Sequence, residues 1–216
     1  MEITWYGNAR FRLRASGLTW WFDTAVQDIV EVADRATVVL SAQSLAQLPA
    51  GSPAATIPVL DGPGEYELRG IPVFGVRIGP PGQDRLARQT AYVVVCDGLR
   101  ICFIGPTTAM PRPADLGDMS PADIVVLPVG TGFGLTVADS QSVARTLEAR
   151  IIIAYTADGS ASGDDVIRRL CRELESDAET VVRSVTMTGQ TIPAVPRVLR
   201  LVSHDWLPDA VRSGNN

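Results

Sequence analysis

The side chains that most often carry out catalysis or bind metal ions are scarce in this sequence. One histidine, His204, stands near the C-terminus, and all 19 basic residues are arginines because the chain contains no lysine. A Schiff-base lysine or a phosphate-loop lysine is therefore excluded. His204 and Asp205 could form a catalytic pair, but adjacent residues of an extended segment point to opposite faces. We therefore do not expect these two side chains to act together.

Cysteine, serine and threonine give no stronger signal. The three cysteines, Cys96, Cys102 and Cys171, are an odd number without CxxC spacing, which argues against a disulfide framework and a thiolate metal site. A serine or threonine nucleophile needs an adjacent base, and the histidine is remote in sequence. The turn at 131–134 lacks the spacing and the lysine of a phosphate loop, so we interpret it as a packing turn.

Composition narrows the class of protein. The chain has 216 residues, of which 46% are hydrophobic and 20% charged, as in soluble globular proteins. A net charge of −5 disfavours nucleic acid and anionic lipid as partners. No basic leader precedes an apolar run and no stretch approaches about 20 apolar residues, so we expect no membrane span and a cytoplasmic location.

The first half of the sequence predicts short strands and hairpins. Two hairpin turns are indicated, at Ser16-Gly17 and at Asp97-Gly98. The strands expected around them cover residues 3–14, 18–22, 37–40, 56–60, 70–78, 91–96 and 100–104. Trp5, Trp20 and Trp21 fall in the first hairpin, where tryptophans are more often core residues than an exposed patch.

The second half predicts α/β units. Continuous apolar runs at 124–129 and 150–155 flank a helical stretch at 140–149, the pattern of buried strand, helix and buried strand. A further helix is expected at 163–174 and closing strands at 180–186 and 197–202. We expect one domain over residues 1–216, with a frayed end at 212–216.

Several segments, in order along the chain, resemble one family. They are residues 5–13 (WYGNARFRL), 22–24 (FDT), 61–70 (DGPGEYELRG), 97–102 (DGLRIC) and 127–130 (LPVG). The sequence resembles the metallo-β-lactamase-fold hydrolases, in particular the short prokaryotic zinc-dependent branch. This resemblance implies an α+β (α/β) fold, a four-layer αββα sandwich with a dinuclear metal site at one edge of its sheets.

The metal ligands that the resemblance implies are missing. The family motif HxHxDH would begin after the strand at 37–40, where this chain reads AQSLAQ over residues 42–47. The positions matching metal ligands or their neighbours are held by Asn8, Ala42, Ser44, Ala46, Gln47, Pro106 and Thr156. Pro106 stands where the family has its bridging aspartate, and Thr156 where a histidine is expected. None of these side chains binds such ions well, so we expect no metal and no cofactor.

Three nearby residues could bind a ligand instead. Arg10, Asp23 and Gln43 would face the vacated pocket, where Arg10 could replace the positive charge of the ions and hold a carboxylate or phosphate. Two simpler interpretations compete with this one. Arg10 alternates with Arg12 and Arg14 as on a solvated strand face, and Asp23 could simply cap a turn.

The sequence therefore predicts a pseudoenzyme of the metallo-β-lactamase fold that binds a small polar ligand or a protein. The alternative is a hydrolase that uses a rebuilt carboxylate site, from Asp23, Asp61, Glu65 or Asp158, or a metal-free mechanism at Ser44 or Thr156. A homo-oligomer or a non-catalytic subunit is a third option. Fold resemblance alone cannot choose among these functions.

Overall fold

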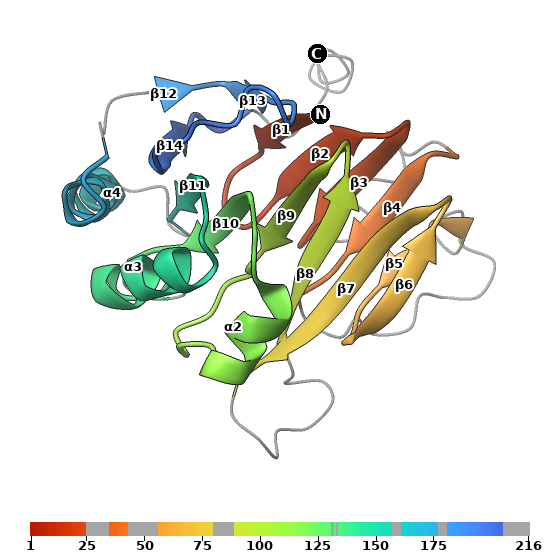
Figure 1. Cartoon of the computed structure of the whole chain (residues 1–216), viewed down its shortest axis with the longest axis horizontal. Coiled ribbons are helices and arrows are strands. Elements are labelled where there is room, and N and C mark those ends of the chain that lie inside the picture. The colour runs from red at the N-terminus through yellow and green to blue at the C-terminus, as the bar shows by residue number, and fades with distance from the viewer. Residues whose placement is uncertain are drawn as a thin grey trace, which may run out of the picture.

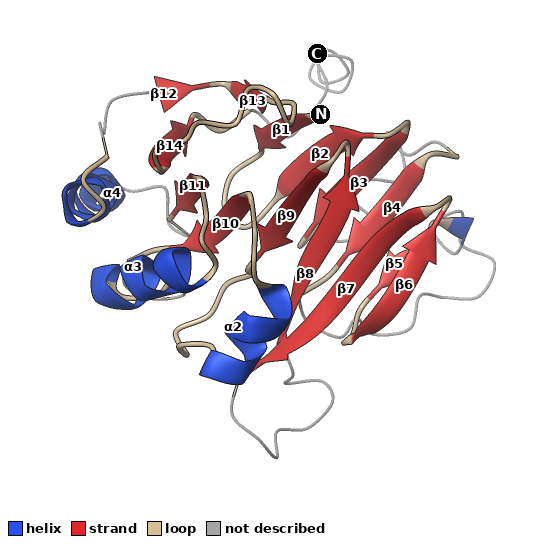
Figure 2. Ribbon diagram, in the orientation of Figure 1, coloured by secondary structure: helices blue, strands red, loops and turns tan. Residues whose placement is uncertain are grey.

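Two mixed β-sheets pack face to face in this protein (Figures 1 and 2). The computed structural model describes residues 1–24, 35–42, 56–79, 89–130, 132, 134–156, 161–176 and 181–204, and of 161–164 it describes the backbone only. Some predicted features lie outside the described residues. They are Gln43, Ser44, Ala46, Gln47, Asp158, Asp205 and the frayed end at 212–216.

The first sheet has six strands in the order β13-β1-β2-β3-β4-β5. They are β1 (Glu2–Trp5), β2 (Phe11–Ala15), β3 (Leu18–Phe22), β4 (Thr37–Leu40), β5 (Val59–Leu60) and β13 (Ser184–Thr186). The predicted hairpin at Ser16-Gly17 is present between β2 and β3. The φ angles of these two residues are 49° and 74°, as a type I′ turn requires.

The second sheet has eight strands in the order β12-β14-β11-β10-β9-β8-β7-β6. They are β6 (Gly64–Leu68), β7 (Ile71–Ile78), β8 (Gln89–Cys96), β9 (Leu99–Phe103), β10 (Ile124–Pro128), β11 (Ile151–Tyr155), β12 (Val181–Val182) and β14 (Arg197–Leu201). The predicted hairpin at Asp97-Gly98 joins β8 to β9. Strands β9, β10, β11 and β14 run parallel, as the buried apolar runs of the second half predicted.

Apolar side chains fill the space between the sheets. Phe11, Leu13 and Trp20 of the first sheet meet Tyr92 and Ile101 of the second sheet in one buried cluster. Trp20 is fully buried and Trp21 is 4% exposed, so both are core residues as predicted. This packing fixes the distance between the sheets, and with it the width of the pocket at their edge.

Among the described residues, three helices cover the outer face of the eight-stranded sheet (Figure 1). They are α2 (Pro113–Met119), α3 (Val137–Thr146) and α4 (Ala161–Glu173). The two sheets and this helical layer are three of the four expected layers, and they establish the α+β fold. None of the described helices is both long and apolar enough to cross a bilayer.

Helix α3 begins about three residues before the helical stretch predicted at 140–149, and α2 was not predicted from the sequence. Helix α2 is seven residues long, and Gly117 interrupts any apolar stripe. Its start is nevertheless encoded locally, because Pro113 occupies the first turn and the Asp115 carboxylate accepts a hydrogen bond from the Arg112 backbone N–H.

The turn at 61–64 packs against β7. A Cβ atom added to Gly75 would lie 2.6 Å from the backbone oxygen of Gly62, so only glycine allows this approach. The Tyr66 hydroxyl donates a hydrogen bond of 2.9 Å to the same oxygen. These contacts support a structural role for the DGPG segment.

Candidate functional site

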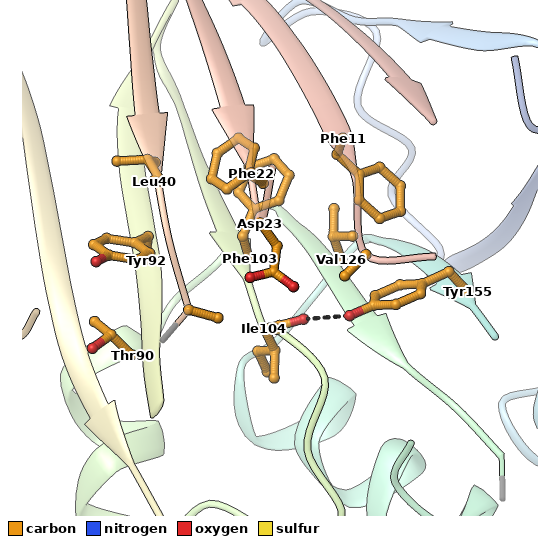
Figure 3. A pocket seen from close by; sticks show the side chains of 13 residues that line it. Phe11, Phe22, Asp23, Leu40, Thr90, Tyr92, Phe103, Ile104, Val126 and Tyr155 are labelled. Atoms are coloured by element: carbon orange, nitrogen blue, oxygen red, sulfur yellow. Dashed lines mark hydrogen bonds between the residues drawn. The ribbon is translucent and has the colours of Figure 1, made fainter. Parts of the chain in front are cut away.

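A small cavity lies between the sheets, where β3, β4, β9 and β11 end. Most of its lining comes from the last residues of these strands and the residues that follow them, and β2, β8 and β10 contribute further residues. The volume of the cavity is about 20 Å³. The largest side chains around it are those of Phe11, Phe22, Leu40, Tyr92, Phe103 and Tyr155 (Figure 3). A space of this size holds about one water molecule.

Asp23 brings the one charged side chain among the described lining residues (Figure 3). It follows β3 with a φ angle of 47°, and its backbone N–H donates a hydrogen bond of 2.9 Å to the Leu40 oxygen. Burial raises the pKa of its carboxyl group, and this effect exceeds the opposing influence of the Ala42 backbone N–H and the Arg10 charge. The carboxylate is therefore held in a poorly solvated position.

We expect Asp23→Asn to raise the free energy of unfolding near neutral pH. Because the folded-state pKa is raised, the folded protein binds this proton more tightly than the unfolded chain does, and ionisation on raising the pH costs stability. The asparagine amide avoids that cost, can still accept from Ala42 N–H, and tolerates positive φ. Urea unfolding should show the gain at about pH 7 and almost none at about pH 3. Lower stability of the variant at neutral pH would contradict this account.

Two tyrosines beside the cavity use their hydroxyl groups to bind backbone oxygens. The Tyr155 hydroxyl donates to the Ile104 oxygen at 3.2 Å (Figure 3), and the Tyr92 hydroxyl lies 2.8 Å from the Leu60 oxygen and 3.1 Å from the Ser41 oxygen. Burial raises the pKa of both phenols far above neutrality. Both therefore stay protonated and act as structural links rather than as bases.

Aromatic rings occupy most of the space at this edge of the sheets. The Phe22 and Phe103 rings are stacked, with 3.2 Å between centroids, and Phe11 meets the Tyr155 ring edge-on at 5.2 Å. We call Phe11, Phe22, Phe103, Tyr92 and Tyr155 the aromatic cluster. Such well-packed rings leave little room for a ligand unless a side chain moves.

Four of the positions that match the family's metal ligands lie in the described residues, and they are Asn8, Ala42, Pro106 and Thr156. Ala42 lines the cavity, and a Cβ atom added to Gly105 would lie 2.3 Å from the Ala42 Cβ. Thr156 is buried, and the Pro106 oxygen accepts a hydrogen bond of 2.8 Å from the Gln89 side chain. Asn8 is exposed. A methyl group, a proline ring and a threonine hydroxyl are not the donor set of a dinuclear centre, so these residues do not fit one.

The other candidate residues do not converge on the cavity. Within the described ranges, no group of three histidine, cysteine, aspartate or glutamate side chains could hold a metal ion. The His204 backbone N–H donates to the Trp5 oxygen at 2.8 Å, and its ring lies 3.1 Å from the Arg183 oxygen. Glu65 lines a different hollow. Of the carboxylates considered for a rebuilt site, Asp23 is therefore the one that lines this cavity among the described residues.

Sequence reasoning missed the aromatic residues of the site. It examined Thr156 and Pro106 but not Tyr155 and Phe103, which end the strands just before them. The available signal was that four apolar strands end in an aromatic residue or leucine at the predicted pocket, where a metal site would need polar side chains. Gly105 carried no signal because its role depends on the approach of Ala42 from another strand.

Comparison with known proteins identifies a family that matches this sequence and solved structures that share its fold. The family profile described as "Beta-lactamase superfamily domain" matches residues 2–156. No curated protein matches the sequence closely enough to count as a relative.

Solved structures share the fold over nearly the whole chain. A metallo-β-lactamase-superfamily protein from Thermotoga maritima is 21% identical with a TM-score of 0.69, over 94% of this chain and 99% of that one. Igni18, a metallo hydrolase from Ignicoccus hospitalis, is 11% identical with a TM-score of 0.61, over 94% of each chain. An isothiocyanate hydrolase from Delia radicum gut bacteria is 13% identical with a TM-score of 0.57, over 87% and 99%. Identities this low carry the fold and not the activity.

Proposed function

This chain belongs to the β-lactamase superfamily, whose profile spans residues 2–156, and we propose that it is a pseudoenzyme of the metallo-β-lactamase fold. In this proposal it has no dinuclear metal centre and acts by binding a small ligand or another protein. The single observation that carries the proposal is the lining of the cavity at the sheet edge. Aromatic and aliphatic side chains surround a volume of about 20 Å³ there.

The same cavity bears on where a ligand would bind. Of the predicted ligand-binding residues, Asp23 lines the cavity, Arg10 is close enough for its charge to lower the Asp23 pKa, and Gln43 lies outside the described residues. A ligand larger than water would have to displace the aromatic cluster to reach Asp23. We therefore favour a binding surface outside this cavity over the vacated pocket.

The proposal treats residues 1–216 as one domain. Strand β13, close to the end of the described chain, pairs with β1 at its beginning, with Val185 opposite Ile3. A division of the chain between these strands would separate neighbours in one sheet. A cytoplasmic location also belongs to the proposal, and it agrees with the three free and buried cysteines.

Metal content is the test of this proposal. Untagged protein is incubated with zinc, manganese and iron, desalted and measured by inductively coupled plasma mass spectrometry. We expect fewer than about 0.1 ions of each metal per chain, because an apolar cavity offers no set of ligands to replace water around the ion.

One or two tightly held ions per chain would overturn the proposal and put a rebuilt hydrolase first. The Asp23→Asn variant then locates the site. Loss of the ions in this variant would place the metal at the sheet edge, whereas retention would place it elsewhere on the chain. Either location of the metal would contradict the proposal that the protein has no metal centre.

A further inference from the structure

A second and much larger hollow lies between α2, the start of β6 and the end of β7. Its volume is about 620 Å³, within the range of small-molecule sites. Helix α2 lies against β7 at this place (Figure 1). We call this hollow the α2 groove, and it shares no lining residue with the cavity at the sheet edge.

One ion pair in the groove is complete. The Arg112 guanidinium donates to both oxygens of Asp115, with Nε 2.9 Å from Oδ2 and Nη2 2.6 Å from Oδ1. The Arg112 backbone N–H adds a third hydrogen bond to Oδ2, at 3.2 Å. These interactions hold the pKa of Asp115 below its usual range, and the Arg112 hydrogen bond is the largest cause. Asp115 is thus already neutralised by Arg112.

Arg77 is the second cation of the groove, and its guanidinium is not satisfied in the same way. Its charge reaches Asp115 and helps to lower the pKa of that carboxyl group. Its Nη2 atom, however, is buried and has no hydrogen-bond partner among the described residues. A buried donor of a charged group without an acceptor is costly. Asp115 is therefore paired with Arg112, and among the described residues no carboxylate forms an ion pair with Arg77.

We infer that the α2 groove binds a small molecule through an oxyanion, a carboxylate or a phosphate, held by Arg77. Guanidinium groups bind both oxyanions with paired hydrogen bonds. Exposed Glu65 and Asp118 add negative charge to the same groove, so a ligand with a cationic group at its other end suits it better than a dianion. The ligand class is a small zwitterion. This inference stands whether or not the protein proves to be a pseudoenzyme.

The test follows the arginine side chains by NMR in the full-length protein. Protein labelled with ¹⁵N is titrated with two probes, phosphoethanolamine for the phosphate group and 5-aminopentanoate for the carboxylate group. We expect the Arg77 Nε–H signal, assigned by its loss in Arg77→Gln, to shift and saturate by about 20 mM with at least one probe. The probe that saturates identifies the oxyanion.

Matched variants separate binding by Arg77 from general charge effects. In the variants, binding is followed by the backbone amide signals of the groove residues Val76 and Asp118, because the Arg77 Nε–H signal is absent once Arg77 is replaced. Arg77→Gln should weaken binding at least about tenfold, while Arg197→Gln, which removes an exposed arginine from β14, should leave it unchanged within about twofold. Arg77→Lys keeps the positive charge but not the paired donors of the guanidinium, so its affinity for the probe should lie between those of Arg77→Gln and the native protein. This variant serves as the test if Arg77→Gln does not fold.

Three results would overturn the inference. They are no shift with either probe, a shift that grows linearly without saturation, and a saturating shift of the groove amide signals that Arg77→Gln and Arg77→Lys leave unchanged. A purely structural role for Arg77 also makes a different prediction for folding. Since its buried Nη2 donor is unpaired and therefore costly, Arg77→Gln should leave the melting temperature unchanged or raise it, whereas loss of a structural arginine would lower it.

Discussion

Truncation of Phe103 to alanine is expected to lower the free energy of unfolding by about 4 kcal/mol, the largest effect at the candidate site. Phe103 is 4% exposed. Its ring stacks on Phe22 and lies 6.4 Å from the centre of the Phe11 ring. Since both neighbours come from the opposite sheet, the structure cannot close the hole by moving one side chain. Urea or thermal unfolding measures the loss.

A matched variant distinguishes packing from other causes. Phe103→Leu keeps most of the volume and should cost less than about 2 kcal/mol. The alanine variant also enlarges an apolar cavity, so benzene should raise its melting temperature and leave that of the native protein unchanged. If Phe103→Ala cost less than about 1 kcal/mol, the aromatic cluster would not be the packed core of this edge.

The sequence predicted the hairpins and the parallel strands because local signals encode them. Ser16-Gly17 and Asp97-Gly98 adopt positive φ angles, which few other residue pairs accept. The continuous apolar run at Ile151–Tyr155 is fully buried, as a central parallel strand must be. Helix α2 escaped prediction because its seven residues carry no apolar repeat. Its position is set by the cap between Arg112 and Asp115 and by packing on β7.

The candidate site also has features that the sequence predicts and features that it does not. The absence of histidine and carboxylate at the matched positions can be read directly from the sequence, since it is a property of single residues. The filling of the pocket cannot, because Phe22, Phe103 and Tyr155 come from three strands whose separation depends on the whole sandwich. Arg77 likewise looks like any strand arginine until α2 lies beside it.

The missing metal ligands and the aromatic filling of the pocket have a common physical cause. A metal site keeps polar ligands apart around ions, and the space they enclose must be filled by something else when those ligands are replaced. Here Ala42 and Gly105 approach closely and aromatic rings pack behind them. Under the proposed function, this packing takes the space that a metal site would need, and returning one histidine would not provide that space.

Gly105→Ala tests this closure and should lower the free energy of unfolding by about 3 kcal/mol. The new Cβ atom would lie 2.3 Å from the Ala42 Cβ, a distance that real Cβ atoms do not tolerate. Both residues follow buried strands, β9 and β4, so relief requires the movement of backbone rather than of a flexible side chain. The expected loss can be measured by urea unfolding.

A second substitution shows whether Ala42 is the cause. In the double variant Ala42→Gly, Gly105→Ala, the methyl group has moved from one strand end to the other, and most of the lost stability should return. The coupling energy between the two positions should then be at least about 2 kcal/mol. Additive losses would mean that the two strand ends are not in contact and that the pocket is open. Under the closed arrangement, Ala42→His should be at least as destabilising as Gly105→Ala, because the imidazole is larger than the methyl group that already fails to fit.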